Sequence, residues 1–444
     1  MKKYLVWIGA MILVMALTSP ALAQDWAKKF EATSLFQIWS VAVNKQDFKM
    51  NVADDDITTR GVSSRINFFL NWGDPKYVRG VIGFEADSTN WGEPAWDNTG
   101  TTANPSGRMG VRNTDQVQLE IKHAYLDFTV PNTPISVAVG IQNFGYGGRL
   151  FQSCDVPGMK VTAAFAPHQI QAVWWREDET SRTTYQVNDY YGLEYKLSQK
   201  AFNVYAYGFY KNDLRSDSYS DNPYWIGVGG GFRPGNLNLS GQLVYIGGKR
   251  DNVTGNDVDY RAYAAEILAQ YTIGPGLSVA AEGFYASGKD ADDTSKSKQY
   301  FRPIGSESHS NFGLGRTVFF WMNFSQFGNQ HQKQSDFGGM WYGRLNGIYS
   351  PMPWLQLSGN YLYIGDTSKG ADGLAGINSP TGARTDKDKD FIGHEINLIT
   401  TLKIYQNFTY NIGLGYFLPG DVYDSATKSA DNAWAVNTGM QLAF

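Results

Sequence analysis

The sequence contains a single cysteine, Cys154, among its 444 residues. One thiol cannot form an internal disulfide, and its isolation argues against most thiolate metal sites. Cys154 also lies far from the N-terminal segment in which a signal peptide would be cleaved, so it is not a lipoprotein anchor.

Long apolar runs are absent after residue 17. Tyr4 to Leu17 is apolar, it follows Lys2 and Lys3, and Ala21-Leu22-Ala23 provides a small-x-small cleavage site. This combination predicts a secretory signal peptide over residues 1–23. No later stretch is long enough for a spanning helix. A membrane form of residues 24–444 would therefore be a closed β-barrel, which satisfies its backbone groups without water.

Basic residues are in deficit. Removing Lys2 and Lys3 leaves 36 Lys and Arg against 42 Asp and Glu, a net charge of −6 for the mature chain. Nucleic-acid binding calls for a basic patch, so we expect no nucleic-acid partner. None of the five histidines has a spacing to Ser or Asp that signals a catalytic triad. We expect no enzyme activity, no cofactor and no metal site.

Instead, apolar residues alternate with small or polar residues along much of the chain. In the C-terminal segment, Trp434, Val436, Met440, Leu442 and Phe444 fall on one parity, and small or polar residues fall on the other. Period two is the mark of a β-strand. An uncharged apolar face ending in Phe444 suits the lipid-facing side of a barrel strand. The terminal Phe resembles the signal that the outer-membrane assembly machinery of Gram-negative bacteria recognises, and Trp434 and Phe444 are its candidate residues.

Short and long connections alternate along the mature chain. Pro, Gly and Asn mark eight short turns, at 71–76, 131–134, 166–168, 198–200, 233–236, 274–276, 350–353 and 405–407. The long polar connections span 44–59, 89–115, 144–158, 179–186, 214–222, 248–259, 288–337, 366–390 and 419–430. Short turns on one side and long loops on the other are typical of outer-membrane barrels.

The turns predict an all-β fold, an antiparallel up-and-down barrel of 18 strands over residues 24–444. Sixteen strands is the alternative, because Arg316 to Phe324 could be an added strand or a loop packed into the lumen. A barrel of either size leaves an aqueous channel, whereas eight strands would be filled by side chains.

Charged residues recur on the inward parities of the predicted strands. The acids are Glu85, Asp87, Glu120, Glu194, Glu266, Glu282 and Glu395, and the bases are Arg65, Arg79, Lys122, Arg344 and Lys403. Seven acids against five bases predict a weak preference for cations.

The third long connection is the best candidate for a functional site. It begins Phe144-Gly-Tyr-Gly-Gly148 and contains Arg149 and Asp155. Its position and its glycines resemble the constriction loop of general porins, in which an acidic loop faces a basic wall. The resemblance implies that Asp155 faces Arg65 and Arg79. The candidate pore-lining residues are Arg65, Arg79, Glu85, Glu120, Lys122, Arg149, Asp155, Glu266, Glu282 and Arg344.

Taken together, these features resemble the homotrimeric outer-membrane porins of Gram-negative bacteria, and the N-terminal third is similar to those of sulfate-reducing bacteria. The resemblance implies a water-filled channel in the cell outer membrane for passive diffusion of ions and small hydrophilic solutes. It also implies a homotrimer in contact with lipopolysaccharide and with the barrel-assembly machinery. A substrate-specific sugar channel is the alternative, with Tyr190, Tyr205, Tyr207, Phe209 and Trp225 as inward aromatics.

Overall fold

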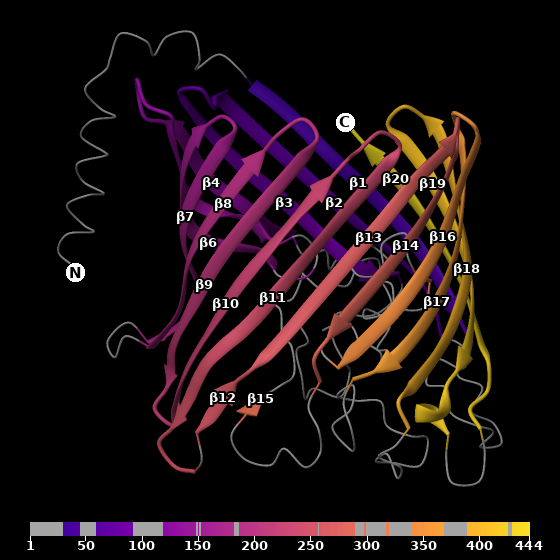
Figure 1. Ribbon diagram of the computed structural model, residues 1–444. Coiled ribbons are helices and arrows are strands. Elements are labelled where there is room, and N and C mark those ends of the chain that lie inside the picture. The colour runs from indigo at the N-terminus through magenta and orange to yellow at the C-terminus, as the bar shows by residue number, and fades with distance from the viewer. Residues whose placement is uncertain are drawn as a thin grey trace.

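The computed structural model describes residues 30–44, 59–91, 119–147, 150, 152–181, 186–255, 257–288, 297–298, 317–318, 339–367, 389–424 and 429–444. These residues form a closed antiparallel barrel of 18 long strands, which confirms the predicted fold class and strand number (Figure 1). No helix in this part of the chain is long and apolar enough to cross a membrane.

The strands of the wall follow one another around the barrel in chain order. They are β1 (Phe30–Val43), β2 (Thr59–Asp74), β3 (Val78–Asn90), β4 (Leu119–Thr129), β5 (Ile135–Tyr146), β6 (Gln152–Phe165), β7 (His168–Ser181), β8 (Gln186–Ser198), β9 (Phe202–Ser216), β10 (Tyr219–Phe232), β11 (Leu237–Asn252), β13 (Ala262–Gly274), β14 (Leu277–Ala286), β16 (Met340–Met352), β17 (Leu355–Asp366), β18 (Phe391–Tyr405), β19 (Phe408–Pro419) and β20 (Ala433–Ala443).

Closure removes every edge from the wall. β20 pairs with β1 from Leu35 opposite Ala443 to Val43 opposite Ala435, and with β19 on its other side. The wall strands run from 10 to 16 residues, which is long enough for a tilted strand to cross a bilayer. The short strands β12 (Val258–Tyr260) and β15 (Ser297–Lys298) pair with each other beyond β11, at the rim that carries the long connections.

All eight predicted short turns join neighbouring strands at the same rim, the upper one in Figure 1. Two of the predicted long connections are much shorter than expected. β9 and β10 are separated only by Asp217 and Ser218, and most of the third connection belongs to β5 and β6. Extended pairing continues through their polar residues, which composition alone had marked as loop.

The polarity of the wall is inverted relative to a water-soluble protein. Along β18, Glu395 and Asn397 are 0% and 4% exposed, whereas Ile396 and Leu398 are 51% and 42% exposed. Alternate residues of a strand lie on opposite faces of the sheet. The predicted parity is therefore confirmed on this strand, with an apolar outer face and a polar inner face.

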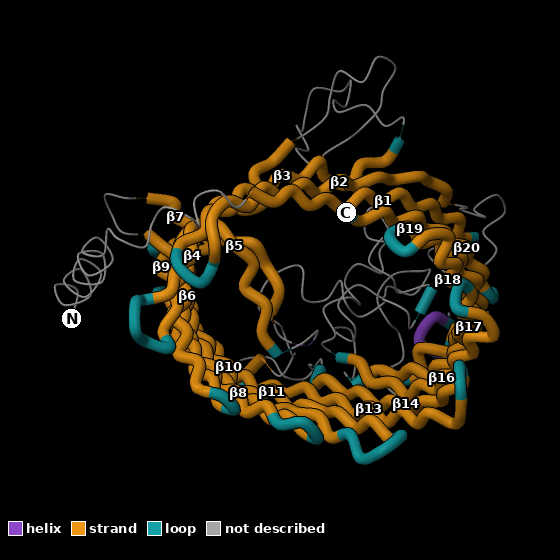
Figure 2. The backbone as a smooth tube through the Cα atoms, turned by 90° about the horizontal axis from the view of Figure 1, so that it is seen from above, coloured by secondary structure: helices purple, strands orange, loops and turns teal. Residues whose placement is uncertain are grey.

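The β5–β6 hairpin leaves the wall and enters the barrel (Figure 2). β5 pairs with β4 only as far as Ile141, and β6 pairs with β7 only from Gly158, while β5 and β6 continue to pair with each other up to Tyr146 and Gln152. Gly140 lies opposite Gly158 at this exit. Its φ is +133°, and a Cβ there would lie 2.2 Å from the carbonyl oxygen of Ala124. Only glycine tolerates that conformation and that approach.

Candidate functional site

A chain of charged side chains connects the inward hairpin to the barrel wall. Asp155 of β6 accepts from two residues of β4, with Lys122 Nζ 2.8 Å from its Oδ2 and His123 Nε2 3.0 Å from its Oδ1. Lys122 Nζ also lies 3.0 Å from Glu85 Oε2 on β3, and Glu85 Oε1 is 3.7 Å from Arg65 Nε on β2. The side chains of Lys122, His123 and Asp155 keep 12 to 17% of their surface exposed, so they remain in contact with solvent.

A β-bulge brings two neighbouring residues of β4 to the same acid. Gly83 pairs with His123, but the next residue, Phe84, pairs with Ile121, so Lys122 is the extra residue. A bulge locally re-aims side chains. Lys122 and His123 therefore both reach Asp155, although strict alternation would place them on opposite faces. For this reason the sequence did not indicate His123 as a site residue.

The other side of the hairpin packs on an aromatic wall. Phe144 and Tyr146 are fully or almost fully buried, and their rings lie 5.2 Å from Trp175 and 4.9 Å from Phe209, respectively. Trp175 in turn stacks on Tyr190 at 4.9 Å. Aromatic pairs at these separations add to the burial of their area. The hairpin is thus fixed by ion pairs on one side and by aromatic packing on the other.

The aromatics that favoured a sugar channel belong largely to this packing. Tyr190, Tyr207, Phe209 and Trp225 face inward as predicted, but each is at most 5% exposed. Tyr205 alone of the five is half-buried rather than buried. Little of the surface of these four rings is therefore open to the lumen.

A second polar network lies on β14, β16, β17 and β18, strands that Figure 2 shows across the barrel from the β5–β6 hairpin. Arg344 Nε and Nη2 donate to Glu282 Oε2 at 2.9 and 2.6 Å, and Tyr342 Oη donates to Glu282 Oε1 at 2.6 Å. Arg344 Nη1 donates to Asn360 Oδ1 at 2.7 Å, and Asn360 Nδ2 donates to Asn397 Oδ1 at 2.9 Å. Buried charges are tolerated because each has polar partners.

Part of the longest connection packs against this second network. The backbone N–H of Val318 donates to Glu395 Oε1 at 2.6 Å, and the Thr317 hydroxyl donates to Glu395 Oε2. Both residues are buried against the inner face of the wall. Of the segment Arg316 to Phe324, only these two residues are described, and they are not strand.

The remaining candidate residues are more scattered. Arg79 forms a bidentate pair with Asp127 of β4 near the short-turn rim, with Nε 3.2 Å from each carboxylate oxygen, so it does not face Asp155. Glu120 is exposed on β4. Glu266 of β13 accepts from Gln242 Nε2 at 2.7 Å, away from the hairpin network. Arg149 and the side chain of Asp87 lie outside the described residues.

Comparison with known proteins yields structural neighbours only. No protein-family model matches the sequence, and no curated protein matches it. The solved structure of OccAB1 from Acinetobacter baumannii has a TM-score of 0.58 at 11% identity, over 96% of this chain and 99% of that one. A BenF-like porin from Pseudomonas fluorescens Pf-5 has a TM-score of 0.54 at 9% identity, over 94% and 99%. OpdQ from Pseudomonas aeruginosa has a TM-score of 0.53 at 8% identity, over 95% of this chain and 99% of that one. Identities this low establish likeness of fold alone.

Proposed function

We propose that this protein is a porin of the Gram-negative outer membrane, which forms a water-filled channel for passive diffusion of ions and small hydrophilic solutes. The observation that carries the proposal is the closed 18-strand wall with an apolar outer face and a charged inner face. A barrel of this size exceeds what inward side chains alone can fill. One of the solved structures of similar fold is that of a BenF-like porin.

In this proposal the β5–β6 hairpin sets the width of the channel. Asp155 of the hairpin and its β4 partners Lys122 and His123 line the narrow part, and Arg65, Glu85, Glu282 and Arg344 line the wall. Fixed charges of both signs across a narrow wet gap order water and favour polar solutes over apolar ones. Passive diffusion requires no catalytic residue, and we propose no enzyme activity.

Liposome swelling tests the proposed function. Vesicles that contain the purified mature protein should swell in isotonic sugars and amino acids at rates that fall smoothly with solute size. Protein-free vesicles, and vesicles with heat-unfolded protein, are the controls. A sugar-specific channel would instead pass an oligosaccharide faster than a smaller non-sugar solute, and that order of rates would contradict a general porin.

We further propose that residues 1–23 are removed on export and that the barrel assembles as a homotrimer in contact with lipopolysaccharide. The barrel-assembly machinery would recognise the final strand, where the Phe444 side chain is 67% exposed beyond β20. N-terminal sequencing that begins at Gln24 and a native mass of three chains would support these proposals. A monomeric mass in mild detergent would contradict the trimer.

A further inference from the structure

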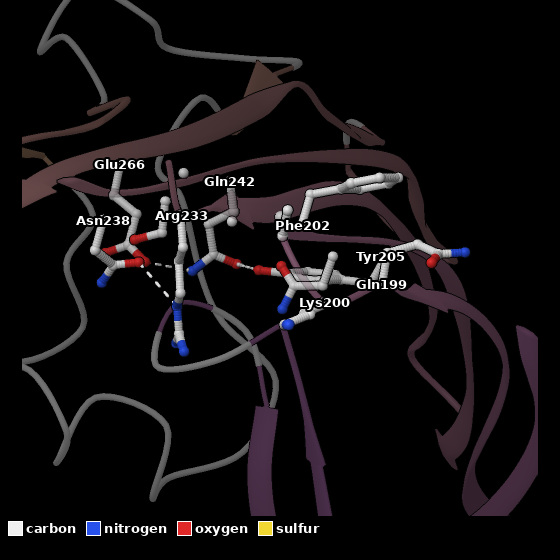
Figure 3. Close-up of a pocket in the computed structure, with 14 residues that line it drawn as sticks. Gln199, Lys200, Phe202, Tyr205, Arg233, Asn238, Gln242 and Glu266 are labelled. Carbon is white, nitrogen blue, oxygen red and sulfur yellow. Dashed lines mark hydrogen bonds between the residues drawn. The ribbon is translucent and has the colours of Figure 1, made fainter. Parts of the chain in front are cut away.

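A polar hollow lies on the inner face of the wall, away from the hairpin network and beside the short turns 199–201 and 233–236. Its volume is about 350 Å³, near the lower end of the range for small-molecule sites (~300–1,000 Å³). It is lined by residues of β9, β10, β11 and β13 and by the two turns (Figure 3).

The hollow exists because β10 presents glycines where its neighbours present side chains. Gly229 and Gly231 lie on the inward parity of β10, beside Tyr205 and Asn203 of β9. A Cβ at Gly229 would lie 2.4 Å from Tyr205 Oη, and one at Gly231 would lie 3.1 Å from Asn203 Oδ1. At Gly229 the Tyr205 side chain fills the space that a Cβ would need, and at Gly231, which lines the hollow, the wall is recessed beside Asn203.

The lining is rich in groups that both donate and accept hydrogen bonds. Tyr205 Oη donates to Gln242 Oε1 at 3.3 Å, Gln242 Nε2 donates to Glu266 Oε1 at 2.7 Å, and Arg233 Nε donates to Asn238 Oδ1 at 3.2 Å (Figure 3). These bonds hold the side chains in place and use only part of their capacity, because an amide has two donors and an acceptor with two lone pairs. Gln199, Asn203 and Ser240 add further uncharged polar groups.

Charge at the hollow is nearly balanced. Lys200 and Arg233 lie at the two turns, and Glu266 lies deeper, on β13. The uncharged amides and hydroxyls outnumber these three charged side chains. A ligand that carries many hydroxyls matches such a lining, since each hydroxyl is both a donor and an acceptor. An anionic ligand would pair only with Lys200 and Arg233 at the rim.

We propose that this hollow is a binding site for a neutral polyhydroxylated solute the size of one sugar ring, at the short-turn end of the channel. The site rests on the proposed function, because solute reaches it through the lumen. It does not require that the channel be specific for sugars, since the hollow is a recess in the wall. It thus adds a weak, saturable binding step to otherwise passive diffusion.

The test is current block in a planar bilayer that contains the mature protein, with D-glucose added to each side in turn. We expect saturable block, and we expect Asn203→Ala and Gln199→Ala each to raise the half-blocking concentration by about two- to tenfold, the loss of one neutral hydrogen bond. Asn407→Ala, in the exposed turn between β18 and β19, is the matched control and should leave it unchanged. Equal block in parent and variants would overturn the site.

Two further experiments distinguish failure of the proposed site from failure of the proposed channel. If D-glucuronate blocks at a concentration tenfold or more below that of glucose, the hollow is an anion site and the proposal is wrong. If the parent shows no conducting steps, the proposed channel fails, and calorimetry on the detergent-solubilised protein decides the site instead. Glucose binding that weakens in Asn203→Ala would then support the site, and absence of binding would overturn it.

Discussion

Asp155 contacts two side chains of β4, the Lys122 ammonium and the His123 imidazole, and it lies on the hairpin that enters the barrel. The resemblance to general porins implies that this acid faces Arg65 and Arg79. In the structure Arg65 is reached only through Glu85 and Lys122, and Arg79 pairs with Asp127. Asp155 therefore has two roles at once, one in fixing the hairpin and one in setting the charge beside it.

Neutralising Asp155 should make the channel less favourable to cations. Asp155→Asn leaves Lys122 with one carboxylate instead of two, so the narrow part gains a positive charge where charge matters most. We expect the reversal potential in a salt gradient to shift toward anions, and the shift to shrink at 1 M salt, where the screening length is about 3 Å. Asp217→Asn, an exposed acid in the β9–β10 turn, makes the same charge change away from the hairpin. An Asp155→Asn potential equal to that of the parent would remove the hairpin from the constriction.

The Glu282–Arg344 pair should matter for stability more than for conduction. Arg344→Met leaves the buried Glu282 carboxylate without its main partner, and breaking a buried pair in this way costs about 3–5 kcal/mol. We expect the folded, fast-migrating form on cold gels to convert to the unfolded form at a lower temperature. The double variant Glu282→Gln/Arg344→Met, which removes both charges, should recover part of the loss. Unchanged thermal stability in Arg344→Met would show that the pair contributes little.

At the scale of elements, the strands and short turns could be predicted from the sequence because both depend on the residues of a short segment. Period-two alternation fixes a strand, and Pro, Gly and Asn fix a turn. The bulge at Lys122 was not readable, because it depends on how β4 registers against β3. The extent of the β5–β6 hairpin was not readable either, because its polar residues pair with each other rather than with the wall.

The final strand should be required for assembly. β20 closes the barrel between β19 and β1, and Phe444 exchanges two backbone hydrogen bonds with Ser34, at 2.5 and 3.0 Å. Deleting Phe444 removes both bonds and an outward aromatic side chain. We expect less protein in the outer membrane and more degradation in the periplasm, measured by fractionation. A truncated protein that reaches the membrane at the parent level in its heat-modifiable form would contradict this.

Neighbouring residues of β13 offer a matched test of the two faces. Ile267 is 64% exposed on the outer face, whereas Leu268 lies on the inner parity, paired with Ser240 and Glu282 of the adjacent strands. Ile267→Arg should reduce the stability of the folded protein in the membrane by about 2–4 kcal/mol if the residue lies near the bilayer centre. Leu268→Arg should cost clearly less, because its charge enters a polar lumen. Folding titrations into vesicles measure both, and the reverse order would mean that the assigned faces are exchanged.

For the molecule as a whole, pairing of the inward charges should limit the ion selectivity of the proposed channel. Lys122 and Arg65 lie against Glu85, and Arg344 lies against Glu282. Glu194 is paired with Lys196, a base that is not among the five inward bases counted from the sequence. The excess of seven acids over five bases is therefore partly compensated, and any cation preference of the channel should be small and sensitive to salt.

Single-channel recording on the purified mature protein in a planar bilayer tests the central claim most directly. A wide barrel narrowed by a hairpin that is fixed on two sides should give long-lived current steps of uniform size, with current proportional to voltage and conductance rising with bulk salt. Insertion without such steps, shown by heat-modifiable protein recovered from the same vesicles, would contradict a water-filled channel.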